Sequence, residues 1–250
     1  MRIKFNKEIE FYLKKIFFSQ KYLLKKRLER SIKNNDEEEI KLVKSFITPN
    51  TDSIDVGVYR GVYSYEMSKY SKLVHSFEPN PILFNNIEKD LKKIIKNIKF
   101  YNNALSDKDG LMSLKIPIRN KSYDKKNYEE YFQMGKASIH NKNDIDEFES
   151  FDIKSKLLDS FNFTNKISFI KIDVEGHEQH VLEGGINLIK KDKPNLLIEI
   201  EKKHRSDSIE KTFMYLDNLG YKPYTFKNNK LNLLTDVDNS DSVNYIFKVN

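Results

Sequence analysis

The sequence of 250 residues contains no cysteine and no tryptophan, and only 8 glycines and 6 prolines. Without cysteine, the chain has no disulfides, no thiolate nucleophile, and no iron–sulfur or cysteine-ligated zinc centre. No run reaches the ~18 consecutive apolar residues that a membrane-spanning helix requires. The first residues also lack the apolar core and small-residue cleavage site of a secretory signal, so we expect a cytoplasmic protein.

The net charge of +7 is distributed unevenly along the chain. Residues 1–34 contain eleven Lys and Arg and three Glu, whereas the remaining residues contain 33 basic and 34 acidic side chains. A nucleic-acid-binding domain carries its basic charge on the folded body. Because the body of this chain is nearly neutral, we expect no specific nucleic-acid partner.

Apolar residues recur near helical spacing over residues 5–33, with Lys and Arg between them, and predict a basic helix. This helix can lie on an anionic surface, such as the inner face of a membrane or an acidic partner, or it can pack on the domain. A second helix is expected over residues 36–46. We assign residues 1–50 to a basic helical arm and residues 51–250 to the main domain, and a homodimer is compatible with the sequence.

A glycine-rich segment follows the first β-branched run and has the pattern D-x-G-x-x-x-G, from Asp55 through Gly57 to Gly61. Glycines at a strand-to-helix turn let the backbone bend tightly and approach a ligand closely. The pattern is typical of a nucleotide-type loop and differs from the G-x-G-x-x-G of dinucleotide sites. The next strand ends in Glu78, about 20 residues beyond this turn, where doubly wound folds place the carboxylate that binds a ribose.

The apolar run Ile167–Ile172 ends in four ionisable residues within six positions: Asp173, Glu175, His177 and Glu178. Such groups at the carboxyl end of a buried strand indicate a functional edge of a sheet. The following apolar strand ends in Glu199 and Glu201. Asp173 and His177 could join these two acids in an Mg²⁺ or Mn²⁺ site. Acids at a strand end need no metal to explain them, however, and we predict no metal.

Strands and helices alternate through five units, which predicts an α/β fold with a mainly parallel sheet and helices on both faces. Two alternating segments, Lys222–Lys227 and Ser242–Val249, are separated by 14 residues. This is too few for a crossover helix, so an antiparallel C-terminal hairpin is expected. Residues 117–150 contain few aliphatic side chains and are predicted to form an irregular loop insertion. A short helix is expected over Ser155–Phe161.

In their order along the chain, the segments DVGVYRG, SFEPNP, NALSD, FIKIDVEGHE and LLIEIE resemble the FkbM-type methyltransferases, a class I group that depends on S-adenosylmethionine. The most specific part is IKIDVEGHE followed by VLEGG. The resemblance implies a Rossmann-like class I methyltransferase fold, with a seven-stranded, mainly parallel sheet and a reversed last strand. It also implies S-adenosylmethionine as cofactor and O-methylation of sugars or natural-product hydroxyls.

The resemblance further implies which residues hold the cofactor. The turn from Asp55 to Gly61 would hold the methionine portion, Glu78 the ribose, and the segment Asn103–Ser106 the adenine. The full set expected to contact the cofactor is Asp55, Gly57, Tyr59, Gly61, Ser64, Glu78, Pro79, Asn80, Asn103, Ala104, Leu105, Ser106 and Asp173.

A hydroxyl acceptor is a poor nucleophile until a base shares its proton. His177 is the first candidate for this base, because an unperturbed imidazole has a pKa of about 6.5. Asp173 is the second candidate, and Glu175 could orient His177. The residues expected to contact the acceptor are Glu178, Glu199, Glu201, Ser138 and His140.

Three hypotheses follow from these observations. The leading one is an S-adenosylmethionine-dependent O-methyltransferase that acts on a hydroxyl of a sugar, glycan, glycolipid or natural product. The second is a nucleic-acid methyltransferase that uses the basic arm, although IDVEG stands where such enzymes have D/N-P-P-Y/F after the fourth strand. The third is a non-catalytic binding module whose cofactor site is blocked by Tyr59 and Arg60, although Asp55, Glu78 and Asp173 are retained.

Overall fold

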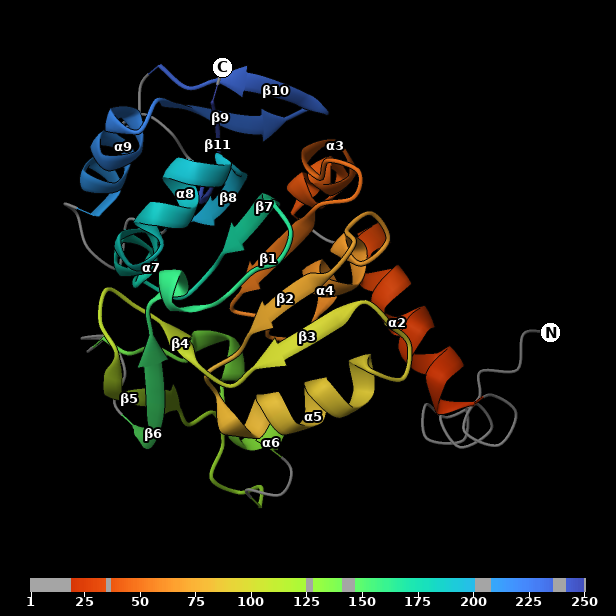
Figure 1. Cartoon of the computed structure of the whole chain (residues 1–250). Coiled ribbons are helices and arrows are strands. Elements are labelled where there is room, and N and C mark those ends of the chain that lie inside the picture. The colour runs from red at the N-terminus through yellow and green to blue at the C-terminus, as the bar shows by residue number, and fades with distance from the viewer. Residues whose placement is uncertain are drawn as a thin grey trace.

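The computed structural model describes residues 19–34, 37–124, 128–140, 147–200, 208–235 and 242–249. These residues form two sheets (Figure 1). The larger sheet has eight strands in the order β10-β9-β11-β8-β7-β1-β2-β3, and the smaller has three in the order β4-β6-β5. Among the described residues, no helix is long and apolar enough to cross a membrane.

Five adjacent parallel strands, β8-β7-β1-β2-β3, run from the middle of the larger sheet to one of its edges. Their carboxyl ends lie along one edge, which positions the functional site. The strands are β1 (Asp52–Val56), β2 (Val74–Phe77), β3 (Ile98–Tyr101), β7 (Ile167–Ile172) and β8 (Asn195–Glu199).

Helices cover both faces of this sheet, as the alternation of strands and helices predicts (Figure 1). One face packs against α2 (Gln20–Asn34), the short helices η1 (Glu38–Leu42) and α3 (Val43–Phe46), α4 (Val62–Met67) and the C-terminal part of α5 (Pro81–Leu91). The other packs against α7 (Glu178–Gly184), α8 (Ile186–Asp192) and α9 (Ser208–Asn218).

The central strand β7 is buried on both faces, which explains its almost continuous apolar sequence. Ile170 and Ile172 belong to the core beneath α7 and α8, whereas Phe169 belongs to the core beneath α3 and α4. Each of these three side chains has an exposed fraction of 1% or less. Burial of one such side chain stabilises the fold by roughly 1.5–3 kcal/mol.

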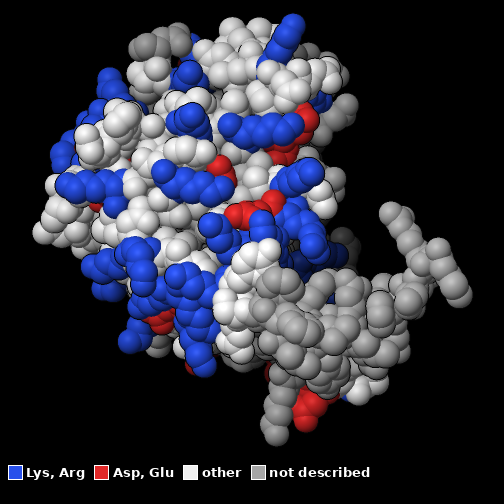
Figure 2. Space-filling model, turned by 90° about the vertical axis from the view of Figure 1, so that its right-hand side faces the viewer, with Lys and Arg blue, Asp and Glu red and all other residues white. Residues whose placement is uncertain are grey.

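The N-terminal helix α2 packs on the domain from Gln20 onward. Its Leu24 and Leu28 are buried in the core beneath α3 and α4. Lys25 and Lys26 are exposed, and Lys26 forms an ion pair with Glu29 at 2.9 Å. Lys and Arg cover much of the surface on the side of the molecule shown in Figure 2. The first part of the predicted helix, residues 5–18, lies outside the described residues.

One sequence prediction near the second sheet is wrong. Residues 155–161 are not a helix, because Ser155 and Lys156 end strand β6 (Phe148–Lys156), and only the single turn η3 (Leu158–Ser160) follows. Strand β6 pairs from Phe148 to Ser155 with β5 (Gly110–Pro117) and also joins the short β4 (Ala104–Leu105). The hydrophobic pattern of β6 is weak because only two of its nine residues are fully buried.

The segment predicted as an irregular loop also contains local structure. The short helices α6 (Tyr128–Tyr131) and η2 (Met134–Lys136) lie in it, and Lys115 bridges to Ser138. Phe132 and Met134 are buried in a third apolar cluster. This part of the insertion therefore packs against the second sheet.

The C-terminal strands β9 (Tyr221–Lys227) and β11 (Asn244–Val249) pair antiparallel, as predicted. Strand β11 lies between β9 and β8, and it is antiparallel to both. An additional strand, β10 (Lys230–Leu233), forms a tight hairpin with β9. The larger sheet therefore has eight strands, one more than the sequence resemblance implies.

Candidate active site

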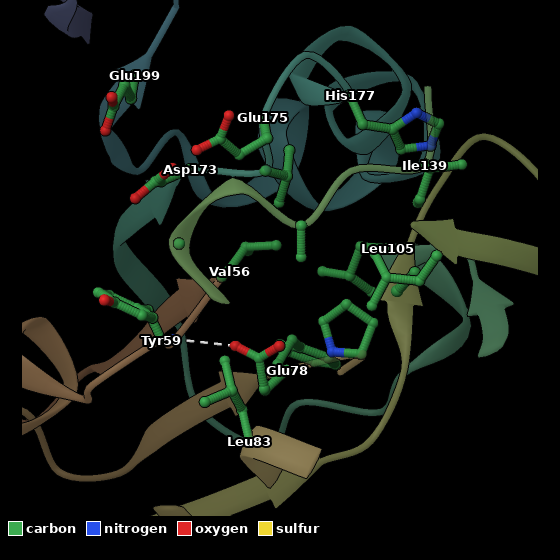
Figure 3. Close-up of a pocket in the computed structure, with 18 of the residues that line it drawn as sticks. Val56, Tyr59, Glu78, Leu83, Leu105, Ile139, Asp173, Glu175, His177 and Glu199 are labelled. Atoms are coloured by element: carbon green, nitrogen blue, oxygen red, sulfur yellow. Dashed lines mark hydrogen bonds between the residues drawn. The ribbon is translucent and has the colours of Figure 1, made fainter. Parts of the chain in front are cut away.

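A pocket of about 260 Å³ lies at the carboxyl edge of the parallel strands. The ends of β1, β2, β7 and β8 and the residues after β3 form its walls, and the segment 134–139 completes them (Figure 3). The lining residues are Glu37, Val56, Gly57, Tyr59, Phe77, Glu78, Pro79, Leu83, Asn103, Ala104, Leu105, Leu114, Met134, Gly135, Ala137, Ile139, Asp173, Val174, Glu175, His177 and Glu199.

Gly57 allows the ends of β1 and β7 to approach each other at the floor of the pocket. Its φ angle is +83°, and a β-carbon at this position would collide with the carbonyl oxygen of Asp173. Glycine is the residue that adopts this backbone region without steric cost. The backbone of Gly57 therefore packs directly against that of Asp173 at the edge of the pocket.

Tyr59 lines the pocket but leaves it open. Its φ angle is +48°, and its ring lies against Gly135. The guanidinium of Arg60 lies 5.2 Å from the centre of the Tyr59 ring, and Arg60 is not among the lining residues. The predicted blocking of the cofactor site by these two side chains therefore does not fit this arrangement.

Glu78 is a buried carboxylate that holds the backbone on both sides of the pocket floor. Its Oε2 accepts a hydrogen bond of 2.9 Å from the backbone N–H of Tyr59, and its Oε1 accepts one of 3.0 Å from that of Asn80. Burial raises the pKa of Glu78 to about 7, although these two backbone bonds oppose the rise. Each oxygen retains further capacity to accept a hydrogen bond from a ligand.

A buried lysine, Lys171, organises the acidic groups below the pocket. Its Nζ lies 2.7 Å from Oδ2 of Asp173. Burial alone would lower the pKa of Lys171, but the attraction of Asp173 and Asp55 outweighs it and raises that pKa above its usual value. Asp55 is fully buried, accepts a bond of 2.5 Å from the Ser64 hydroxyl, and has a raised pKa because of its burial. Asp55 and Ser64 therefore support the site from behind.

His177 lies at the adenine side expected from the sequence, and not beside Asp173 (Figure 3). Its Nε2 is 2.9 Å from the Ser106 hydroxyl, and its Nδ1 is 3.0 Å from Nε2 of His140. Between Asp173 and His177, Glu175 and Gly176 both have positive φ angles, of +54° and +98°. These two residues turn the chain, so His177 faces Ser106.

Three carboxylates lie together at the opposite end of the pocket. Asp173 and Glu199 follow the paired residues Ile172 and Ile198 on adjacent strands, and Glu175 lies beside them in Figure 3. Glu37 also lines the pocket. The position of Glu37 could not be predicted from the sequence, because it depends on how the N-terminal helices pack on the domain.

The insertion supplies a further wall of the pocket, a segment from which the sequence predicted only Ser138 and His140 as site residues. Met134, Gly135, Ala137 and Ile139 all line it. The buried Ser138 donates a hydrogen bond of 2.9 Å to the carbonyl oxygen of Glu175, which attaches this wall to the loop after β7. Its small and mixed residues give no periodic signal, so only the tertiary structure reveals their position.

The predicted site residues divide into two groups. Those that line the pocket are Gly57, Tyr59, Glu78, Pro79, Asn103, Ala104, Leu105, Asp173, Glu175, His177 and Glu199. Those that the structure describes but that do not line the pocket are Asp55, Gly61, Ser64, Asn80, Ser106, Ser138, His140 and Glu178. Asn80 caps α5, and the Glu178 carboxylate accepts a bond from the N–H of Gly176. Glu201 lies outside the described residues.

The sequence matches the model of the methyltransferase FkbM domain over residues 55–223, which is more than half of the chain. The chain belongs to the FkbM methyltransferase family. This is a family of S-adenosylmethionine-dependent enzymes, so the match confirms the predicted family and cofactor. No curated protein matches the sequence.

Solved structures show the fold of this family. The chain is similar to the FkbM methyltransferase of Methylobacillus flagellatus KT, at 14% identity and a TM-score of 0.50. The similarity covers 84% of this chain and 50% of that one, so this chain spans about half the length of that relative. The likeness agrees with the predicted class I methyltransferase fold.

Two further solved structures have lower TM-scores. A putative methyltransferase from Streptococcus mutans, in complex with SAH, has 12% identity and a TM-score of 0.47, over 85% of this chain and 96% of that one. A SAM-dependent O-methyltransferase from Thermotoga maritima has 13% identity and a TM-score of 0.44, over 89% of this chain and 71% of that one.

The residues of the pocket fit the cofactor of the FkbM family. Apolar side chains, among them Phe77, Pro79 and Leu105, form the end that suits an adenine ring. Glu78 in the middle has oxygens that can accept from ribose hydroxyls. The carboxylates at the other end, beside Asp173, suit a cationic sulfur and an amine.

Proposed function

We propose that this protein is an S-adenosylmethionine-dependent O-methyltransferase that acts on a hydroxyl of a sugar, glycan or glycolipid. The single observation that supports this proposal best is the pocket at the sheet edge, with Glu78 at its centre and Asp173 at its acidic end. The family match supports methyl transfer. The sequence resemblance implies that the acceptor is a hydroxyl of this kind.

The residues that would hold the three portions of the cofactor lie at the ends of neighbouring strands. Glu78 would accept from the ribose hydroxyls, and the bare backbone at Gly57 would lie against the methionine portion. The Asn103–Leu105 segment would lie beside the adenine. When bound, the cofactor supplies an electrophilic methyl group on a cationic sulfur, which becomes a neutral thioether after transfer.

The acceptor hydroxyl would bind at the acidic end, between Asp173 and Glu199. The Asp173 carboxylate accepts a hydrogen bond from the hydroxyl, which orients an oxygen lone pair toward the methyl group. As the new O–C bond forms, the hydroxyl proton moves to a carboxylate oxygen of Asp173. Lys171 holds the Asp173 carboxylate in position, because its Nζ lies 2.7 Å from Oδ2 of Asp173.

His177 has a different role in this arrangement from the one expected at first. Both of its ring nitrogens face protein groups, Ser106 and His140. We therefore propose that His177 positions the Ser106 segment on the adenine side, and that Asp173 is the group that contacts the acceptor. Glu175 lines the same end as Asp173 and would shape the acceptor site.

The test is a methyl-incorporation assay with labelled S-adenosylmethionine over glycan and glycolipid fractions. We expect Asp173→Asn to lower kcat about 10²–10⁴-fold, the usual contribution of a positioned proton acceptor. His177→Gln is expected to raise KM for the cofactor and to change kcat much less. Glu183→Gln, an exposed position on α7, is the matched control.

Two outcomes would contradict this proposal. The absence of labelled product from every hydroxyl-bearing fraction would exclude the proposed acceptor class. The second outcome is full kcat in a folded Asp173→Asn variant and a large loss of kcat in His177→Gln. This result would mean that His177, and not Asp173, accepts the proton.

A further inference from the structure

Three histidines from two parts of the chain meet beside the pocket. One ring nitrogen from each of His140, His177 and His180 lies within 4.8 Å of the other two. His177 and His180 are at the start of α7, and their rings stack with centroids 4.2 Å apart. His140 follows the insertion wall and places its Nε2 3.0 Å from Nδ1 of His177.

The hydrogen bonds around His177 determine which of its nitrogens can bind a cation. The Ser106 hydroxyl donates its hydrogen to the Asp107 carboxylate at 2.9 Å. A hydroxyl has one hydrogen, so Ser106 must accept the 2.9 Å bond from Nε2–H of His177. The lone pair of His177 is then on Nδ1, which faces the other two histidines. Metal-binding histidines are commonly held in one tautomer through their other ring nitrogen in this way.

His180 provides an independent observation. Its Nδ1 is buried and has no hydrogen-bond partner among the residues that the structure describes. A buried polar atom without a partner costs roughly 1–3 kcal/mol. Folded proteins satisfy nearly all such atoms, and where no protein group does so, an ordered water or a bound ion commonly fills the position.

We propose that His140, His177 and His180 bind one divalent transition-metal ion of the kind that prefers imidazole, such as Zn²⁺, Co²⁺ or Ni²⁺. The three ligands are neutral nitrogen donors, which suit these ions and not Mg²⁺ or Ca²⁺. Three protein ligands leave a fourth position for water. The site is separate from the carboxylate end of the pocket, and it does not depend on the proposed methyl transfer.

Binding requires one ring movement and one proton shift. Nε2–H of His140 donates to Nδ1 of His177, so this hydrogen must leave Nε2 before the nitrogen can bind the ion. Ligand nitrogens around a tetrahedral zinc ion lie about 3.3 Å apart, because each Zn–N bond is about 2.0–2.1 Å long. The pair His140 and His177 is already near this spacing. The His180 ring must turn out of its parallel stack so that its lone pair points at the ion. This half-buried ring has one unpartnered nitrogen, so the turn costs no hydrogen bond at Nδ1.

The ion would attach the insertion wall to α7. His140 directly follows Ile139, and both Ile139 and His177 line the pocket. Cross-linking these two segments would hold the wall in place on the adenine side. Metal binding should therefore raise the melting temperature of the protein, because an ion that binds only the folded state stabilises it.

The test uses the full chain, stripped of metal with a chelator and titrated with Zn²⁺ by calorimetry. A parallel titration with Co²⁺ follows the visible absorption bands that indicate tetrahedral nitrogen coordination. We expect one equivalent to bind, and expect His140→Gln and His180→Gln each to weaken binding by at least about tenfold. His75→Gln is the matched control, because it removes an imidazole that contacts Asp52 and Tyr101 elsewhere in the sheet.

Two results would overturn the proposal. One is the absence of Zn²⁺ and Co²⁺ binding to the unchanged chain at micromolar ion. The other is equal affinity of the unchanged chain and the folded His180→Gln or His140→Gln variant. The two substitutions lie in different segments, so misfolding of one variant leaves the other informative. Failure of the methyl-transfer assay would not change either readout.

Discussion

The Glu78 carboxylate accepts a hydrogen bond from the backbone N–H of Tyr59, with 2.9 Å between Oε2 and the nitrogen. This bond joins the end of β2 to the turn after β1. The same carboxylate is proposed to bind the ribose of the cofactor. We expect Glu78→Gln to weaken cofactor binding about 10–100-fold, because hydrogen bonds to a charged acceptor contribute about 1.5–3 kcal/mol. The measurement is the rise in melting temperature on addition of SAH, which should shrink in this variant.

The matched control for Glu78 is Glu88→Gln. Glu88 lies on α5 and pairs with Lys92 at 2.6 Å at the surface. This substitution removes the same charge without touching the pocket. An equal thermal shift in Glu78→Gln and Glu88→Gln would contradict the assignment of the ribose site.

Cofactor affinity should also depend on pH through Glu78. Burial raises its pKa to about 7, so below that pH the group is protonated and accepts ligand hydrogen bonds poorly. Affinity should therefore rise about tenfold between about pH 6 and about pH 8. The probe is 5′-methylthioadenosine, which carries the adenine and ribose but no titrating amine. In Glu78→Gln, the affinity should no longer rise with pH. An unchanged rise in this variant would mean that another group causes the pH dependence.

The close approach of β1 and β7 at Gly57 can be tested by comparing Gly57→Ala with Gly220→Ala. The φ angles of the two glycines are +83° and +84°, but a β-carbon collides with Asp173 only at Gly57 and meets nothing within 4 Å at Gly220. Gly220→Ala should cost about 1–2 kcal/mol of unfolding free energy, from backbone strain alone. Gly57→Ala should cost more and should abolish cofactor binding. Denaturant unfolding of both variants measures the difference, and equal losses would contradict the collision.

The contribution of the buried charges to stability can be measured by substituting Lys171. Lys171→Met leaves Asp173 and Asp55 without their cation, and the loss of one partner of a buried ion pair typically costs about 3–5 kcal/mol. Lys154→Met, at an exposed position of β6, should change stability by less than about 0.5 kcal/mol. The measurement is the midpoint of urea unfolding at neutral pH. Equal midpoints for the two variants would mean that Lys171 is not structurally required.

Much of the fold and the centre of the site could be predicted from the sequence. The parallel strands are apolar runs that end in polar residues, and the strand ends of such a sheet meet at one edge. This is why the sequence places Gly57, Glu78 and Asp173 at one edge of the sheet, where all three line the pocket. They occupy positions that follow directly from local sequence, and the structure brings them to one pocket.

The rest depends on contacts between distant segments. Strand β6 is half exposed, so its pattern is weak, and it was mistaken for loop and helix. The position of His177 depends on two consecutive residues with positive φ angles, Glu175 and Gly176, of which only the glycine could be anticipated. Lys171 carries no sequence signal in a lysine-rich chain, and its importance appears only from its burial beside Asp55 and Asp173.

The most direct test of the account is calorimetric titration of the purified chain with S-adenosylmethionine and with its demethylated product. The pocket predicts one binding site for each, with affinity that Glu78→Gln reduces. The absence of binding of either molecule at millimolar concentration would contradict the central claim that this pocket holds the cofactor.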